Sequence, residues 1–272
     1  MNRLPLPADW LVPDWPAPPG VRAVCTTRAC PAGDAPSAAP WGGFNLADHV
    51  GDAPQAVASH RAALAACTGA RPVFLKQMHG CHVAELDAYA PDGQPADAAV
   101  TASSGVACTV MVADCLPVLL ARADGAAVAA AHAGWRGLAG GVIETAAQAV
   151  RRLGPHPPAS AASATSAVEV VAWLGPCIGP DAFEIGPEVR AAFTAARPEA
   201  AACFTPRPGG KWLAHLPALA RQRLAALGIP AWGNDGSPAW CTFSQPQLFH
   251  SYRARPVTGR MAACVWLQAG HP

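Results

Sequence analysis

The chain has 272 residues, 51% of them hydrophobic, which is enough for one large domain or two small ones with a substantial core. Its net charge is +1 and no run of Lys and Arg exceeds two residues, so it lacks the basic surface expected of a nucleic-acid-binding protein. No run of about 18 apolar residues occurs, because Asp114 and Arg122 interrupt the best candidate, and we expect no membrane-spanning helix.

The ten cysteines do not form the pattern of a disulfide-rich protein. They are widely spaced, none lie in a CxxC pair, and the chain is far longer than small disulfide-stapled domains. The N-terminus also lacks the continuous apolar core of a signal peptide. We therefore expect a soluble cytoplasmic protein with reduced cysteines.

The first quarter of the chain predicts an arm, a strand, a long loop and a helix. Residues 1–20 are rich in Pro and Trp and predict an extended surface arm, while the β-branched run Val21–Thr27 predicts a strand. Pro, Gly and Ser over Cys30–Gly43 predict a long loop, and long loops in compact domains are usually functional or mobile. Asp52–Cys67 predicts a helix, with Asp52 as its N-cap and Pro54 in its first turn.

The middle of the chain predicts a dense series of strands. The apolar run Val73–Gln77 predicts a strand that ends just before His79, and we expect His82–Leu86 to pair with it. Further strands are predicted at Ala98–Thr101, Ala107–Val112, Pro117–Arg122 and Ala127–Ala131. The gaps between them are too short for helices, so this part should be largely antiparallel or mixed sheet.

The second half mixes helices and strands. An apolar stripe predicts a helix over Leu138–Leu153, and the low-complexity segment 154–167 predicts a flexible insertion. The remaining predicted elements are a strand at Val168–Leu174, helices at Pro187–Ala196 and Leu216–Leu227, and a strand at Met261–Leu267. With no internal repeat, we predict one α/β domain that spans residues 1–272.

Three soft metal ligands lie beside apolar runs: His79, Cys115 and His132. One thiolate and two imidazoles suit zinc or copper, and three protein ligands leave a coordination position open, as in catalytic sites. Taken singly, each residue has a structural explanation, since a histidine at a strand end is commonly hydrogen-bonded and an apolar-flanked cysteine commonly fills the core. Taken together, they predict a catalytic metal site with one zinc per chain, or copper in its place.

Several polar residues are candidates for substrate binding. Arg61, Lys76, Arg136 and the backbone N–H groups of the glycine turn before Leu138 could bind phosphate. Asp114 could orient a metal ligand or bind substrate, and Asn45, which closes the long loop, is a further candidate. A metal ion lowers the pKa of bound water to about 7, which would supply a hydroxide nucleophile at neutral pH.

Four motifs carry a resemblance to a known family: Lys76-Gln77-Met78-His79-Gly80, Ala113-Asp114-Cys115-Leu116-Pro117, His132-Ala133-Gly134-Trp135-Arg136-Gly137 and Gly175-Pro176-Cys177-Ile178-Gly179. In order and spacing they resemble the YfiH/YlmD family, whose members have been labelled multicopper polyphenol oxidoreductases (laccase domain), purine nucleoside phosphorylases and peptidoglycan editing factors. The similarity runs from Thr26-Thr27-Arg28 to Ser251-Tyr252-Arg253 and Thr258-Gly259-Arg260, nearly the whole chain.

The resemblance implies a four-layer α/β/β/α fold, also seen in cytotoxic necrotizing factor toxins. It implies a metal held by His79, Cys115 and His132, with phosphorolysis of adenosine, inosine and methylthioadenosine and deamination of adenosine. The chain departs from the family pattern at two places. The loop after Arg28 lacks the usual Gly-Gly pair, and His60 stands where the family usually has Asn.

Two other enzyme classes compete with a nucleoside phosphorylase. Cys115 as nucleophile and His132 as base would make a Cys-His hydrolase, including one that edits peptidoglycan precursors. A copper polyphenol oxidase needs several coppers and many histidines, whereas the chain has nine histidines and no HxH pair, which disfavours it.

His49, Cys81 and His82 are left out of the predicted site. As partners we expect purine nucleosides and phosphate, with no nucleic acid or membrane, and a monomer or weak homodimer.

Overall fold

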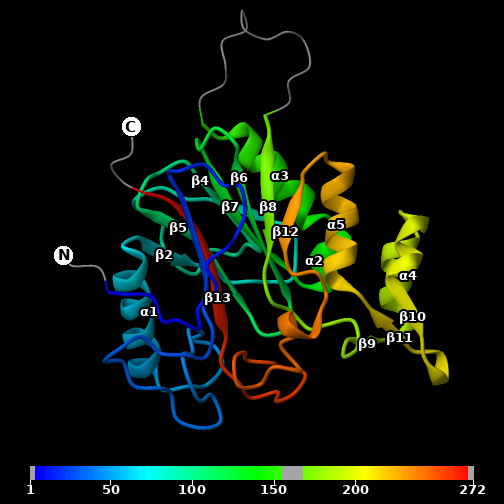
Figure 1. Cartoon of the computed structure of the whole chain (residues 1–272), viewed down its shortest axis with the longest axis horizontal. Coiled ribbons are helices and arrows are strands. Elements are labelled where there is room, and N and C mark those ends of the chain that lie inside the picture. The colour runs from blue at the N-terminus through cyan, green and yellow to red at the C-terminus, as the bar shows by residue number, and fades with distance from the viewer. Residues whose placement is uncertain (1–3, 155–167, 269–272) are drawn as a thin grey trace, which may run out of the picture.

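Two β-sheets pack face to face at the centre of the molecule, as the computed structural model of residues 4–154 and 168–268 shows (Figure 1). The first sheet has four strands, in the order β1 (Val21–Cys25), β13 (Met261–Leu267), β5 (Val106–Val112) and β2 (Arg71–Phe74). The second has six, in the order β12 (Ala231–Gly233), β8 (Val170–Leu174), β6 (Leu116–Arg122), β7 (Val128–Ala133), β4 (Ala98–Thr101) and β3 (Val83–Glu85). Both sheets are mixed, since the pairs β2–β5, β3–β4 and β8–β12 are parallel and the other pairs are antiparallel.

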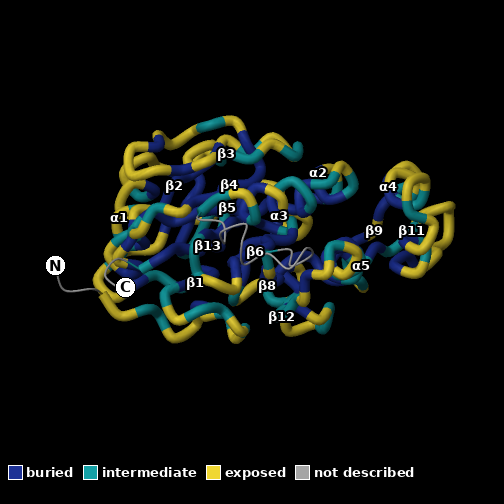
Figure 2. Tube along the Cα trace, turned by 90° about the horizontal axis from the view of Figure 1, so that it is seen from above, coloured by how far each residue is buried: buried dark blue, intermediate teal, exposed yellow. Residues whose placement is uncertain are grey.

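Helices form the two outer layers. Helix α1 (Pro54–Thr68) covers the four-stranded sheet, where its Leu64 and Cys67 pack against Val24 and Trp266. Helices α3 (Val142–Arg152) and α5 (Leu216–Ala226) cover the six-stranded sheet, and the buried residues of the two sheets lie between these layers (Figure 2). The predicted four-layer α/β/β/α arrangement with mixed sheets is confirmed.

The alternation of side chains along β7 explains how this strand serves two cores. Ala129 and Ala131 face α3, whereas Val128 and Ala130 face the four-stranded sheet. Successive residues of a strand point to opposite faces, so His132, at the end of β7, shares the inner face with Val128 and Ala130. The small alanines leave room for close packing on both faces, and burial of such apolar surface is the main force that stabilises the layers.

A small lobe extends from one end of the sandwich (Figure 2). Its strands pair in the order β10 (Phe204–Pro206), β11 (Trp212–Ala214) and β9 (Glu184–Ile185), and helix α4 (Pro187–Thr194) packs on them through Phe193. Three short 3₁₀ helices are also present: η1 (Pro198–Cys203), η2 (Pro208–Gly210) and η3 (Pro238–Trp240). Neither this small sheet nor β12 was predicted from the sequence, because their strands are too short to show a period.

One predicted strand pairing and one predicted helix are wrong. The strands predicted at Val73–Gln77 and His82–Leu86 do not pair, because β2 joins β5 in one sheet and β3 joins β4 in the other. The single helix predicted over Leu138–Leu153 is two helices, α2 (Trp135–Gly140) and α3. Gly141 separates them with a φ of 102°, a left-handed conformation that breaks the helical path and that glycine adopts without strain.

The predicted arm is described from Leu4 onward. Over 4–20 it has neither helix nor strand apart from a bridge between Leu11 and Cys25, and Trp10 is buried against Phe44. The insertion predicted at 154–167 lies outside the described residues except for Gly154.

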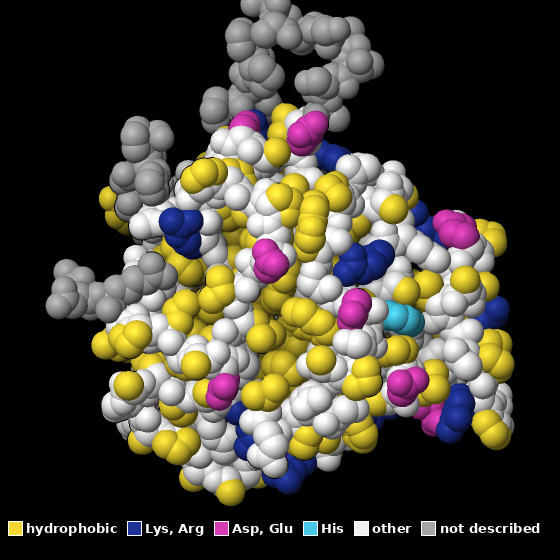
Figure 3. Space-filling view, viewed as in Figure 1, with side chains coloured by type: hydrophobic (Ala, Val, Ile, Leu, Met, Phe, Trp, Pro, Cys, Tyr) yellow, Lys and Arg dark blue, Asp and Glu magenta, His cyan; other side chains and the backbone are white. Residues whose placement is uncertain are grey.

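Among the described residues, every helix is too short or too polar to cross a bilayer. On the face seen in Figure 3, Lys and Arg side chains are scattered among apolar and neutral ones.

Candidate metal centre

Strand register brings Cys115 and His132 together. In the antiparallel β6–β7 pair, Leu116 lies opposite Ala133 and Pro117 opposite His132, so Cys115, just before β6, lies beside the end of β7. On the other side of β7, Ala98 lies opposite Ala131, which places Asp97 next to His132. The backbone N–H of His132 donates to the carbonyl of Asp97 at 2.7 Å, and this extends the β4–β7 ladder to the site.

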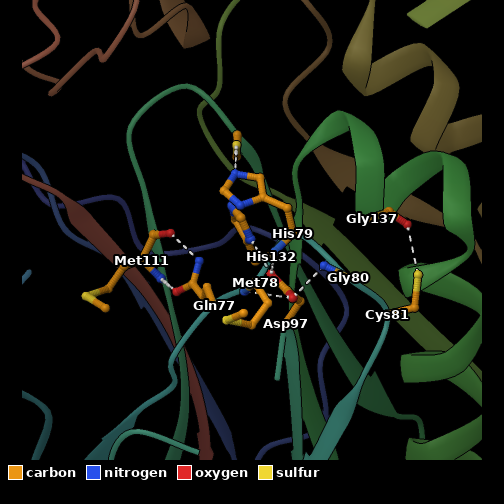
Figure 4. A network of polar contacts seen from close by, with 10 residues as sticks. Gln77, Met78, His79, Gly80, Cys81, Asp97, Met111, His132 and Gly137 are labelled. Atoms are coloured by element: carbon orange, nitrogen blue, oxygen red, sulfur yellow. Dashed lines mark hydrogen bonds and ion pairs between the residues drawn. The ribbon is translucent and has the colours of Figure 1, made fainter. Parts of the chain in front are cut away.

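His79 comes from the loop between β2 and β3, and Asp97 holds that loop. The Asp97 carboxylate accepts hydrogen bonds from the backbone N–H groups of Met78, His79 and Gly80 at 3.0, 2.8 and 2.7 Å (Figure 4). These bonds stabilise a tight turn in which His79 has a φ of 59°, an unusual value for a residue other than glycine. Gln77 ties the start of the same turn to both backbone polar groups of Met111.

The three predicted ligands converge on one point. Their ligand atoms all lie within 4.8 Å of one another, and Sγ of Cys115 is 3.8 Å from Nε2 of His79. Nδ1 of His132 is 2.9 Å from Oδ1 of Asp97, so Nε2 is the nitrogen left for a metal. A histidine that binds a metal through one nitrogen and a carboxylate through the other is the usual arrangement of metal sites, and the donor set suits zinc.

The Cys115 thiol and the two imidazoles form a charge-coupled group. Burial alone would raise the pKa of Cys115, but the neighbouring His132 and His79 lower it to about 6. Burial would lower the pKa of His132, but Cys115 and Asp97 raise it to about 9. At neutral pH the thiolate is therefore the stable form of Cys115, which is the form that binds metal or attacks a carbon atom.

Gly134 has no side chain, and the side chains of His79, Cys115 and His132 occupy the space that a Cβ atom at this position would need. A Cβ atom at Gly134 would lie 2.9 Å from Cδ2 of His79 and 3.0 Å from Sγ of Cys115, so a methyl group would push two ligands apart. The φ of Gly134 is −60°, which alanine adopts freely, and the effect is therefore one of space and not of backbone strain.

We expect Gly134→Ala to weaken zinc binding by about 10–100-fold, the range found when the surroundings of metal ligands are altered. Competition with a chromophoric zinc chelator measures the change. Gly20→Ala is the matched control, because nothing lies within 4 Å of a Cβ at that position. An affinity equal to that of Gly20→Ala would mean that the cluster does not bind metal in this geometry.

The cluster opens into a cavity of about 450 Å³, a volume typical of small-molecule sites. Three arginines, Arg136, Arg253 and Arg260, line it, and within the described ranges none of them forms an ion pair. The remaining lining residues are His49, Gln77, His79, Met111, Ala113, Asp114, Cys115, His132, Trp135, Ile178, Phe183, Leu216 and Tyr252. An apolar wall with several cationic groups fits a ligand that has a flat apolar part and an anionic part.

Asp114 links two walls of the cavity. Its φ is 95°, and its carboxylate accepts hydrogen bonds from the hydroxyl of Thr242 at 2.6 Å and from the backbone N–H of Arg253 at 2.7 Å. Asp114 and His79 are the two described non-glycine residues with positive φ, and both line the cavity. Backbone strain of this kind commonly concentrates at functional sites.

Of the candidate substrate-binding residues, Asp114 and Arg136 line the cavity and three do not. Asn45 is fully buried, and its side chain accepts hydrogen bonds from the backbone of Ala47 and Arg260. Arg61 donates to the carbonyl of Leu46 and pairs with Asp48, and Lys76 is exposed beside Pro95. Asn45 and Arg61 thus support the loop at the cavity wall without lining the cavity.

The sequence analysis missed several residues of the site, and four of them are polar groups with a clear role in its geometry or charge. Asp97 had no local signal, because only the strand register places it beside His132. Arg253 and Arg260 lie in segments that carried the family resemblance, which could have indicated them. His49, which was left out of the predicted site, lines the cavity, whereas the buried Cys177 does not.

The family model for multi-copper polyphenol oxidoreductase laccases matches residues 22–268. The chain belongs to this family. Relatives within it are named purine nucleoside phosphorylases: PA4543 of Pseudomonas aeruginosa is 46% identical over 260 residues, which cover 95% of this chain and 98% of the relative. YfiH of Escherichia coli is 42% identical, over 94% of this chain and 98% of the relative. The resemblance inferred from the four motifs is confirmed.

Solved structures of the family share the fold. Protein NMB0706 of Neisseria meningitidis has a TM-score of 0.84 and 42% identity, over 96% of this chain and 100% of that one. YlmD of Geobacillus stearothermophilus has a TM-score of 0.80 and 25% identity, over 98% and 100%. The layers described above are therefore those of the family.

Proposed function

We propose that the protein is a zinc-dependent purine nucleoside phosphorylase that accepts adenosine, inosine and methylthioadenosine. The observation that carries this proposal is the His79–Cys115–His132 cluster on a cavity whose arginines have no carboxylate partners in the described chain. The names of relatives that match nearly the whole length of the chain support it.

Each part of the nucleoside and phosphate has a complementary wall. Arg136, Arg253 and Arg260 would hold phosphate, because planar guanidinium groups bind phosphate oxygens in pairs. Apolar side chains such as Met111 and Phe183 would cover the purine. Phosphorolysis then needs the phosphate oxygen held in line with the bond between C1′ and the purine nitrogen, and such positioning accounts for a large part of the rate.

Zinc would be held by Sγ of Cys115, Nε2 of His132 and an imidazole nitrogen of His79, and when bound it supplies a Lewis acid at the cavity wall. Asp97 would keep the Nδ1 proton on His132 and thereby keep Nε2 available. Asp114 would hold the segment that carries Arg253. We include adenosine deamination in the proposal, since a Lewis acid beside a purine pocket suits both reactions.

Incubation with adenosine tests the proposal. With phosphate present, we expect adenine and ribose 1-phosphate; without phosphate, we expect inosine and no adenine. Liquid chromatography separates these products, and a chelator followed by added zinc or copper tests which metal restores activity. No turnover of any of the three nucleosides by zinc-loaded protein would reject the proposal.

A Cys-His hydrolase remains the second candidate, because Cys115 has a pKa of about 6 and contacts two imidazoles. A hydrolase that uses Cys115 as nucleophile would keep its activity after chelation and lose it on alkylation with iodoacetamide. The zinc enzyme would lose activity on chelation. A multicopper oxidase is disfavoured, because residues 4–154 and 168–268 contain one group of three metal-ligating side chains.

A further inference from the structure

One imidazole on the cavity belongs to no metal ligand set: His49. It lies in the segment that follows Asn45 and lines the same cavity as His79, Cys115 and His132. Its side chain is 60% exposed, whereas that of the ligand His132 is buried, so His49 lies at the cavity mouth. Nothing in the proposed role of the metal cluster accounts for its position.

A chain of polar contacts holds this imidazole in place. Arg61 on α1 stacks on Phe74, with 4.1 Å from its guanidinium carbon to the ring centroid, and donates to the carbonyl of Leu46 at 2.9 Å. Its Nη2 is 3.2 Å from Oδ2 of Asp48, and Oδ1 of Asp48 is 3.4 Å from Nδ1 of His49. Nδ1 therefore faces a carboxylate, and within the described residues Nε2 of His49 has no hydrogen-bond partner.

The other polar groups of the cavity are poorly suited to donate a proton to a substrate. Guanidinium groups do not act as proton donors to a leaving group in proteins, and the carboxylate of Asp114 already accepts two hydrogen bonds. The thiolate and imidazoles of the cluster are committed to the metal in the proposed function. Gln77 is held by the backbone of Met111, and neither its amide nor the indole of Trp135 transfers protons. The imidazole of His49 and the phenol of Tyr252 remain, and histidine is the side chain that most often transfers protons in enzymes.

We propose that His49 is the general acid that protonates the departing purine, an inference that rests on the proposed phosphorylase function. As a phosphate oxygen forms its bond to C1′, the bond from C1′ to N9 breaks and its electron pair moves into the purine. Nε2 of the imidazolium gives its proton to N7 of the purine. The hydrogen phosphate loses its own proton as it becomes the ester, and that proton restores the imidazolium. Asp48 and Arg61 are positioning residues.

The test compares two leaving groups. Inosine needs a proton as its base departs, whereas 7-methylinosine carries a cationic base that departs without one. We expect His49→Ala, in its zinc-loaded form, to lose about 10²–10⁴-fold in kcat with inosine, the usual contribution of a general acid, but only a few-fold with 7-methylinosine. Added imidazole should restore part of the inosine activity, since the position is open to solvent. Zinc content should equal that of wild type.

His82→Ala is the matched control, an exposed histidine that does not line the cavity, and both activities should be unchanged. Equal losses with both nucleosides in His49→Ala, or no rescue by imidazole, would overturn the proposal. The same leaving-group pattern in Tyr252→Phe, with normal kinetics in His49→Ala, would assign the acid to Tyr252. If wild-type protein turns over neither nucleoside, the phosphorylase proposal itself fails, and that outcome differs from all the others.

Discussion

Cys115→Ala should abolish stoichiometric zinc binding and nucleoside turnover together. The thiolate is the one anionic ligand of the cluster, and its loss leaves two imidazoles that are 4.8 Å apart between ring centroids, one of them on an exposed loop. Two neutral ligands are fewer than zinc sites use. Metal analysis of the purified protein should show about one zinc per chain in wild type, as for a three-ligand catalytic site, and close to none in the variant.

Cys30→Ala is the appropriate control, since Cys30 is also a half-buried free cysteine but lies outside the cavity. Full zinc content in Cys115→Ala would remove Cys115 as a ligand. Activity in wild-type protein that contains no metal, together with its loss in Cys115→Ala, would instead favour the Cys-His hydrolase.

Asp97→Asn should weaken zinc binding by about 10–100-fold, the usual effect of losing a carboxylate that orients a ligand histidine. The substitution acts on two ligands at once, because Asp97 holds the ring of His132 and the backbone turn that carries His79. In Asp97→Asn, the side-chain amide replaces one carboxylate oxygen by an NH₂ group, which cannot accept the hydrogen bonds that the backbone N–H groups of that turn donate. Each buried donor left without an acceptor costs about 1–3 kcal/mol, so the protein should also unfold at lower temperature.

Zinc affinity by chelator competition and the thermal unfolding midpoint measure these two effects separately. Asp92→Asn provides the comparison, since Asp92 is exposed and accepts one backbone hydrogen bond, from Phe74, away from the cavity. The d–d spectrum of the cobalt-substituted protein reports the ligand geometry and should change in Asp97→Asn alone. An unchanged spectrum and affinity would show that the turn at His79 is held without Asp97.

The positions of strands were predicted more accurately than the break in a helix or the pairing of strands, and this difference has a physical cause. Strands such as β5 and β13 were located within one or two residues, because their apolar composition is a property of a few consecutive residues. The break at Gly141 was missed, since a glycine in an alanine-rich helical pattern gives no local sign of its conformation. The pairing of β2 and β3 was wrong, because proximity along the chain does not decide which sheet a strand joins.

The sequence by itself predicted the candidate ligands of the site: His79, Cys115 and His132 are residue types that bind zinc or copper, and their motifs also indicate the family. Residue type needs no coordinates to be read. Only the tertiary structure decided which neighbours act on them. Asp97 reaches His132 through the β4–β7 register, and His49, Arg253 and Arg260 reach the cavity from segments up to about 200 residues apart. Register and loop placement depend on contacts between distant segments, which a local pattern of residues does not encode.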